Sequence, residues 1–385
     1  MTRTGFVHQA LCFGSDAEFL DGARPFVDDG LAAGDAVLAV VRPGTARLLR
    51  EALGGRAREV EFADAGDWYG APSRTLGQYH AYCGRHGTDA VGAPRRVRIV
   101  GEPVWEGRTA FETGEWTRYE SLLNVAFADS GHWILCPYDA RTTPEGVMRT
   151  AGRTHPELVA GPRTPAAGTE YTDPAEFAAE CDLSWPAGLP GGGEDLSFSH
   201  GRTSAVRRVL TTYAGQLGLS GRRTQDMVAA VHEAVSNALR FGGGQGVLRL
   251  RDDDTYVVCE IADAGTASAA GTAPFPGHLP PGVRDVSGHG MWVARQLSDL
   301  ATERLGPTGS VVRLYFRRDP AASGGDGPER DGRADRAGGT AAGRPAGSGD
   351  RFDPGDPGVP AGPGSRADRA DQDGGGDQGA ALLDR

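Results

Sequence analysis

The sequence contains no apolar run that approaches the roughly 20 residues a helix needs to cross a bilayer. Its first residues, MTRTGFVHQALCFGSD, also lack the apolar stretch of a secretory signal. We therefore expect a cytoplasmic protein with no membrane partner.

Cysteine is scarce, and its spacing excludes the short CxxC pairs of zinc and redox sites. Cys12, Cys136 and Cys259 lie in apolar runs, which predicts buried, reduced thiols, with a redox-sensing Cys83 as the alternative. No histidine has a second ligand three or four residues away that would predict a metal site, and we expect His8 to be a hydrogen-bonded core residue.

Positive charge is also in short supply, because 51 acidic residues outnumber 40 basic ones and give a formal net charge of -11. This balance argues against a general binder of nucleic acids, so no direct contact with DNA is expected. The turn after the first expected strand lacks the GxxxxGK[ST] pattern, which excludes a P-loop there.

Strands and helices alternate in the N-terminal part, over 1–158. The expected strands cover 6–13, 36–41, 58–62, 98–100 and 133–136, and the helices between them cover 15–33, 44–53, 73–86 and 114–128. This alternation predicts an α/β domain with a mainly parallel sheet, whose ligands gather at the carboxyl ends of the strands.

The remaining chain divides by composition. Residues 159–193 are rich in Pro, Gly and Ala and predict a linker with a short helix at 173–181. Residues 194–318 predict an α+β two-layer sandwich. From 319 to 385 the composition collapses to Gly, Ala, Asp, Arg and Pro, which predicts a disordered tail.

The stretch TQDMVAAVHEAVSNALR, over 224–240, has the spacing of an amphipathic helix. Its polar side carries Glu233 and Asn237 one turn apart, where both side chains can reach one ligand. On spacing alone, two solvated polar residues explain this pair better than a functional site does. The glycines at 242–244 end the helix.

Two further motifs follow in order. Asp263 and Gly265 come at the exit of a strand over 256–261, which suits a base-edge contact, because Asp accepts from an exocyclic amine and Gly admits a ring. Ser287-Gly288-His289-Gly290-Met291 then precedes a helical pattern, and glycines at a helix start expose backbone N–H groups to phosphates.

Together, HEAVSN, DAG and GHGMW resemble the GHKL-type ATP-binding domain shared by gyrase, heat-shock chaperone, histidine-kinase and mismatch-repair ATPases. HEAVSNALR is similar to the branch of anti-sigma factors and serine protein kinases. The resemblance implies binding of ATP and Mg²⁺, with Glu233 as general base and Asn237 as the metal ligand. The cofactor-binding residues that it implies are Asn237, Asp263, Gly265, Gly288, His289, Gly290, Met291 and Ser310.

Three positions depart from that branch. Phe241 stands where a histidine is frequent, Ala267 replaces a glycine, and Ser310 replaces a threonine on the last strand. We expect the first two to affect affinity more than fold.

The N-terminal part resembles the MEDS-type sensory domain of regulators from methanogens and methylotrophs. The resemblance rests on His8, the GEPVW turn, the TRYESLLNVAF helix and the strand ending CPYD. It implies a sensor of a small molecule or a partner protein. The polar and aromatic candidates are Glu102, Trp105, Tyr119, Glu120 and Tyr138, of which Trp105 and Tyr138 are expected to cap the core and Glu120 to be a solvated helix charge.

Three functions follow from these resemblances. The first is a kinase that phosphorylates a Ser or Thr of an anti-sigma-factor antagonist. The second is nucleotide-gated binding of a sigma factor or antagonist without catalysis. A sensor histidine kinase is disfavoured, because the linker is too short and too rich in Pro and Gly for a phosphoacceptor helix pair. A homodimer is compatible with each function.

Overall fold

The computed structural model describes residues 5–159, 165–183, 188–189, 193–265, 275, 277–281, 289–306 and 309–318. The predicted disordered tail over 319–385 lies outside these residues, as do Ala267 and Gly288. Among the described residues, no helix combines the length and the apolar character that a membrane span requires.

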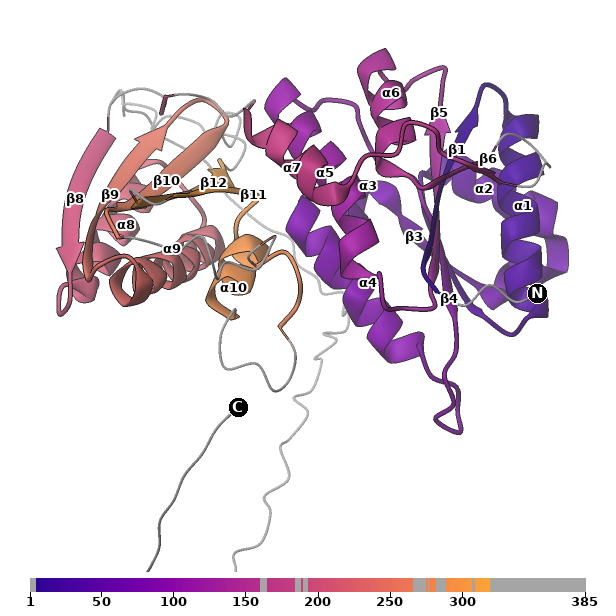
Figure 1. The fold of residues 1–385 in the computed structure, drawn as a ribbon, viewed down its shortest axis with the longest axis horizontal. Coiled ribbons are helices and arrows are strands. Elements are labelled where there is room, and N and C mark those ends of the chain that lie inside the picture. The colour runs from indigo at the N-terminus through magenta and orange to yellow at the C-terminus, as the bar shows by residue number, and fades with distance from the viewer. Residues whose placement is uncertain are drawn as a thin grey trace, which may run out of the picture. The chain divides into compact units, whose positions relative to one another are not determined.

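The N-terminal sheet, whose strands β1, β3, β4, β5 and β6 are labelled in Figure 1, has the strand order β3-β2-β4-β5-β1-β6-β7. Neighbouring strands from β1 to β6 run parallel, and β7 pairs antiparallel with β6. The predicted α/β fold with a mainly parallel sheet is therefore confirmed. The strands are β1 (Val7–Phe13), β2 (Ala36–Val41), β3 (Val60–Asp64), β4 (Val97–Gly101), β5 (Trp133–Asp139), β6 (Glu157–Val159) and β7 (Ala166–Ala167).

Helices cover both faces of this sheet. Successive residues of a strand point to opposite sides, and here the residues on both sides are apolar. In β2, Leu38 and Val40 belong to the core beneath α4 and α5, whereas Val37 and Ala39 belong to the core beneath α1 and α2. The helices are α1 (Asp16–Ala32), α2 (Pro43–Leu53), η1 (Gly54–Glu59), α3 (Ala65–Trp68), α4 (Pro72–His86), α5 (Ala110–Ala126), α6 (Glu145–Thr154) and α7 (Pro174–Leu183).

The stretch predicted as a linker contains β7 and α7 among its described residues. Helix α7 packs on α5, where Arg118 donates to the carbonyl oxygen of Ala178 at 3.1 Å and to Asp182 at 2.7 Å. Phe177 of α7 is buried. Part of this Pro-rich segment is thus attached to the N-terminal sheet.

The C-terminal sheet is antiparallel, with the order β11-β12-β10-β9-β8. Val257, Cys259 and Ile261 of β10 share one core with helices α8 and α9, which confirms the two-layer α+β sandwich. Its elements are β8 (Gly193–Ser199), α8 (Thr203–Gln216), α9 (Gly221–Phe241), β9 (Gln245–Asp252), β10 (Tyr256–Asp263), α10 (His289–Leu297), β11 (Leu300–Gly306) and β12 (Gly309–Arg317). Strand β11 is not predicted from the sequence, because its Thr, Glu and Arg residues break the apolar pattern.

All five cysteines are free thiols. Cys136 and Cys259 are buried, as predicted for strand cysteines. The prediction is wrong for Cys12, which is exposed, since it lies near the open carboxyl end of β1.

Candidate functional site

Helix α9 supplies the first part of the site. Its side with Met227, Val231 and Val235 is fully buried, whereas Glu233 and Asn237 on the other side are partly exposed. The helix begins where the Ser220 hydroxyl accepts from the backbone N–H of Arg223, and Gly242 caps its end. Burial of the apolar side therefore fixes where the carboxylate and the carboxamide point.

The start of α10 lies against this polar side. A Cβ atom placed on Gly290 would be 2.8 Å from Glu233 Oε2 and 3.4 Å from Asn237 Nδ2. Helix α10 packs along α9. The first backbone N–H groups of a helix have no partner within the helix and suit an anion, and here they lie beside the two side chains.

Asp263, at the end of β10, forms the second part of the site. Its Oδ1 accepts from the backbone N–H of Gly265 at 3.0 Å. Ser310 of β12 lies opposite Asp263 in the sheet register. Burial raises the pKa of the Asp263 carboxyl group, and the backbone donors of Gly265 and Ser310 oppose that rise.

Three glycines surround Asp263 so closely that no side chain fits. A Cβ at Gly242 would collide with the Asp263 carboxyl group, and one at Gly309 would collide with its carbonyl oxygen. A Cβ at Gly265 would collide with the backbone of Gly242. The sequence predicts a site role for Gly265 and only a helix end at Gly242, and it gives no prediction for Gly309.

The structure thus gathers the predicted residues into two groups. Glu233, Asn237 and Gly290 meet on the polar side of α9. Asp263, Gly265 and Ser310 meet at the end of β10, where Gly242 at the end of α9 packs against Asp263. His289 is exposed at the start of α10. Met291 packs against Gly277, because a Cβ atom added to Gly277 would lie 2.6 Å from the Cβ of Met291.

Comparison with protein families assigns both halves of the chain. Residues 7–156 match the model of MEDS, the MEthanogen/methylotroph, DcmR Sensory domain. Residues 196–316 match the model of the histidine kinase-like ATPase domain. The chain is a MEDS domain fused to a histidine kinase-like ATPase domain.

A solved structure of the RsbU and RsbW domains of Rv1364c from Mycobacterium tuberculosis is similar at 19% sequence identity, with a TM-score of 0.25. The match covers 33% of this chain and 34% of that one, so it spans only about a third of the solved chain. Among the curated proteins, none matches the chain.

In the MEDS domain, all five candidate side chains are buried. Trp105 and Tyr138 belong to the core, as predicted. Glu102 accepts from the backbone N–H of Arg42 at 2.9 Å. The prediction of a solvated Glu120 is wrong, because its helix turns this residue toward the sheet and leaves it 1% exposed.

The carboxyl ends of the MEDS strands border a pocket of about 300 Å³. Arg141 lies at this pocket and pairs with Asp139 at 2.8 Å and Asp16 at 2.9 Å. This is the edge where a parallel sheet gathers its ligands. Residues lining the pocket include Phe13, Asp16, Thr45, Arg47, Asp139 and Arg141.

Proposed function

We propose that the ATPase domain binds Mg-ATP and transfers the γ-phosphoryl group to a serine or threonine of an anti-sigma-factor antagonist. The observation that carries this proposal is the meeting of Glu233, Asn237 and the first turn of α10 at one point. A carboxylate, a carboxamide and the backbone N–H groups at the start of a helix are the groups that such a transfer requires.

The residues present fit a nucleotide and its metal ion. The Asn237 side-chain oxygen is a hard ligand suited to Mg²⁺, and the N–H groups at the start of α10 suit phosphates. Asp263 can accept from the exocyclic amine of adenine, and the glycines around it allow the end of α9 to pack closely against the exit of β10. Bound Mg²⁺ would neutralise charge that develops on the phosphates.

Glu233 is the proposed general base. Its Oε2 lies beside Gly290, so the carboxylate faces the same point as the N–H groups of α10. A carboxylate in that position can accept the proton of an attacking hydroxyl group. No phosphoacceptor histidine is needed for this reaction.

The resemblance of HEAVSNALR to anti-sigma factors and serine protein kinases supports a sigma-factor pathway as the setting. The partner would be an antagonist protein, a sigma factor or both. Ala267, which replaces a glycine of that branch, favours the second function, in which nucleotide binding gates partner binding without phosphoryl transfer. The MEDS domain would supply the signal to either activity.

Asn237→Ala is expected to weaken Mg-ATP binding by about 10 to 100-fold, because it removes one charge-assisted contact worth roughly 1.5–3 kcal/mol. Isothermal titration of the full chain with ATP, with and without Mg²⁺, measures this effect. The control is His232→Ala, one residue before Glu233 on the same helix. Equal affinity of Asn237→Ala and wild type for Mg-ATP would contradict the assignment, and failure of the wild type to bind would remove the proposed function.

Gly290→Ala is expected to lower phosphoryl transfer by about 10²-fold through displacement of the Glu233 carboxylate. The fold should be preserved, because the obstacle is the flexible end of a side chain and Ala favours a helix by about 1 kcal/mol over Gly. Gly84→Ala is the matched control, since a Cβ there would meet nothing within 4 Å. Transfer rates and melting temperatures of both variants test the idea, and an unchanged rate in Gly290→Ala would count against it.

A further inference from the structure

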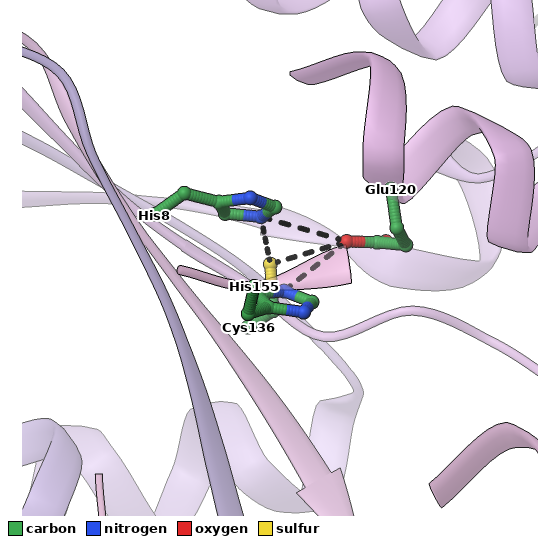
Figure 2. Close-up of side chains that lie close together, drawn as sticks. All are labelled: His8, Glu120, Cys136 and His155. Atoms are coloured by element: carbon green, nitrogen blue, oxygen red, sulfur yellow. Dashed lines mark hydrogen bonds and ion pairs between the residues drawn. The ribbon is translucent and has the colours of Figure 1, made fainter. Parts of the chain in front are cut away.

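Four side chains from distant parts of the sequence meet inside the MEDS domain (Figure 2). His8 lies on β1, Glu120 on α5 and Cys136 on β5, and His155 directly follows α6. One nitrogen, oxygen or sulfur atom from each lies within 4.8 Å of all the others. None of the four side chains is more than 2% exposed.

Four of the six separations between their ligand atoms match the edges of a metal-centred tetrahedron. The Cys136 sulfur is 3.5 Å from both His8 Nε2 and Glu120 Oε2. Glu120 Oε2 lies 3.7 Å from His8 Nε2 and 3.6 Å from His155 Nε2. Zinc bonds of about 2.0–2.3 Å in tetrahedral geometry give ligand separations of about 3.3–3.7 Å.

The neighbours of His8 fix which ring nitrogen is available. His8 Nδ1 is 3.0 Å from Asn124 Oδ1. The Asn124 amide nitrogen donates to the carbonyl oxygens of Ser121 and Thr154, so its oxygen must be the atom that faces His8. His8 therefore donates through Nδ1, and Nε2 directs a lone pair at the cluster.

His155 has the same arrangement. Its Nδ1 lies 2.9 Å from the carbonyl oxygen of Ala151, to which only an N–H can donate. Metal-binding histidines commonly donate their second nitrogen to an oxygen acceptor in this way.

Without a further ligand, the cluster leaves polar atoms unsatisfied. Glu120 Oε1 and His155 Nε2 are buried and make no hydrogen bond. The surroundings are apolar, since Phe6 stacks on the His8 ring and Tyr138 meets His155 edge-on. A buried ring nitrogen without a hydrogen-bond donor is costly, and a cation at the centre would accept the lone pair of His155 Nε2 and remove that cost.

We propose that His8, Glu120, Cys136 and His155 form a buried tetrahedral site for a divalent transition metal ion, zinc by the chemistry of its ligands. A thiolate and two imidazoles select against Mg²⁺ and Ca²⁺, which take oxygen ligands. One thiolate and one carboxylate balance the two charges of the metal, so the occupied site is neutral. Four protein ligands also leave no open position, as in structural zinc sites.

The test uses the full chain, unfolded in chelator and refolded with Zn²⁺ or Co²⁺ alone. We expect one equivalent of either metal per chain by mass spectrometry, release of the thiol proton on binding, and a thiolate-to-cobalt charge-transfer band in the Co²⁺ form. Refolded wild-type protein that takes up no metal would overturn the proposal. ATP plays no part in the measurement, so its outcome is separate from that of the proposed kinase activity.

Cys136→Ser is expected to abolish the charge-transfer band, and Cys83→Ser is the matched control, because Cys83 is a buried thiol of the same core outside the cluster. Cys12→Ser controls for the exposed thiol. Asn124→Ala should weaken metal affinity by about 10 to 100-fold through loss of the His8 contact. A charge-transfer band that persists in Cys136→Ser would place the metal elsewhere and overturn the assignment.

Discussion

Glu233→Gln is expected to lower the rate of phosphoryl transfer to a protein serine or threonine by about 10²–10⁴-fold, the usual contribution of a positioned general base. The amide keeps the size of the carboxylate beside Gly290 but cannot accept the hydroxyl proton. Affinity for Mg-ATP should change little, because Asn237 and the start of α10 are untouched. Single-turnover transfer of labelled γ-phosphate to a candidate antagonist, beside titration of Mg-ATP, separates the two effects.

Asp226→Asn is the matched control, since it makes the same carboxylate-to-amide change on α9 about two turns earlier. It should transfer phosphate at the wild-type rate. A Glu233→Gln variant that matched the wild type would exclude this residue as the base. If the wild type binds ATP but labels no partner, nucleotide-gated sequestration becomes the better description.

Asp35→Ala is expected to cost about 3–5 kcal/mol in the free energy of unfolding of the MEDS domain, the usual cost of breaking a buried ion pair. Arg98 Nε donates to Asp35 Oδ2 at 2.7 Å, and both side chains are at most 7% exposed. The guanidinium also donates to the carbonyl oxygen of Phe26 and lies 4.3 Å above the Trp133 ring. Removal of the carboxylate leaves this positive charge buried without its counter-ion.

Urea unfolding followed by tryptophan fluorescence measures this cost. The double variant Asp35→Ala/Arg98→Leu should recover part of the loss, because it removes the uncompensated charge. Glu145→Ala, which breaks an exposed pair with Arg149, should change stability far less. Equal stability of Asp35→Ala and wild type would show that the pair is not important. The reporting fluorophores in the domain are Trp68, Trp105, Trp116 and Trp133.

Helix α9 shows what local pattern alone predicts well. Its apolar spacing gave the buried side, and that side determines the direction of Glu233 and Asn237. The role of the glycines around Asp263 was harder to predict from the sequence. It depends on the packing of Gly242 against the exit of β10 and on the return of the chain at Gly309. Contacts of this kind arise between elements and leave no periodic trace in the sequence.

The four-residue cluster was missed for a related reason. His8 and Cys136 are 128 residues apart, and neither has a second ligand nearby in the sequence. In the parallel register, Ala10 lies beside Cys136, so His8 and Cys136 project from the same face of neighbouring strands. The pattern within a single helix or strand does not predict the order of strands in the sheet. For the same reason the sequence predicted Glu120 to be a surface charge.

The same arrangement joins the two ends of the MEDS fold. His8 stands on its first strand and His155 follows its last long helix before β6, so an ion bound by both would close nearly the whole domain into a ring. A cross-link around a loop of that size restricts the unfolded chain by about 4–5 kcal/mol in chain-entropy terms. The supply of metal in the cell would then set what fraction of this domain is folded.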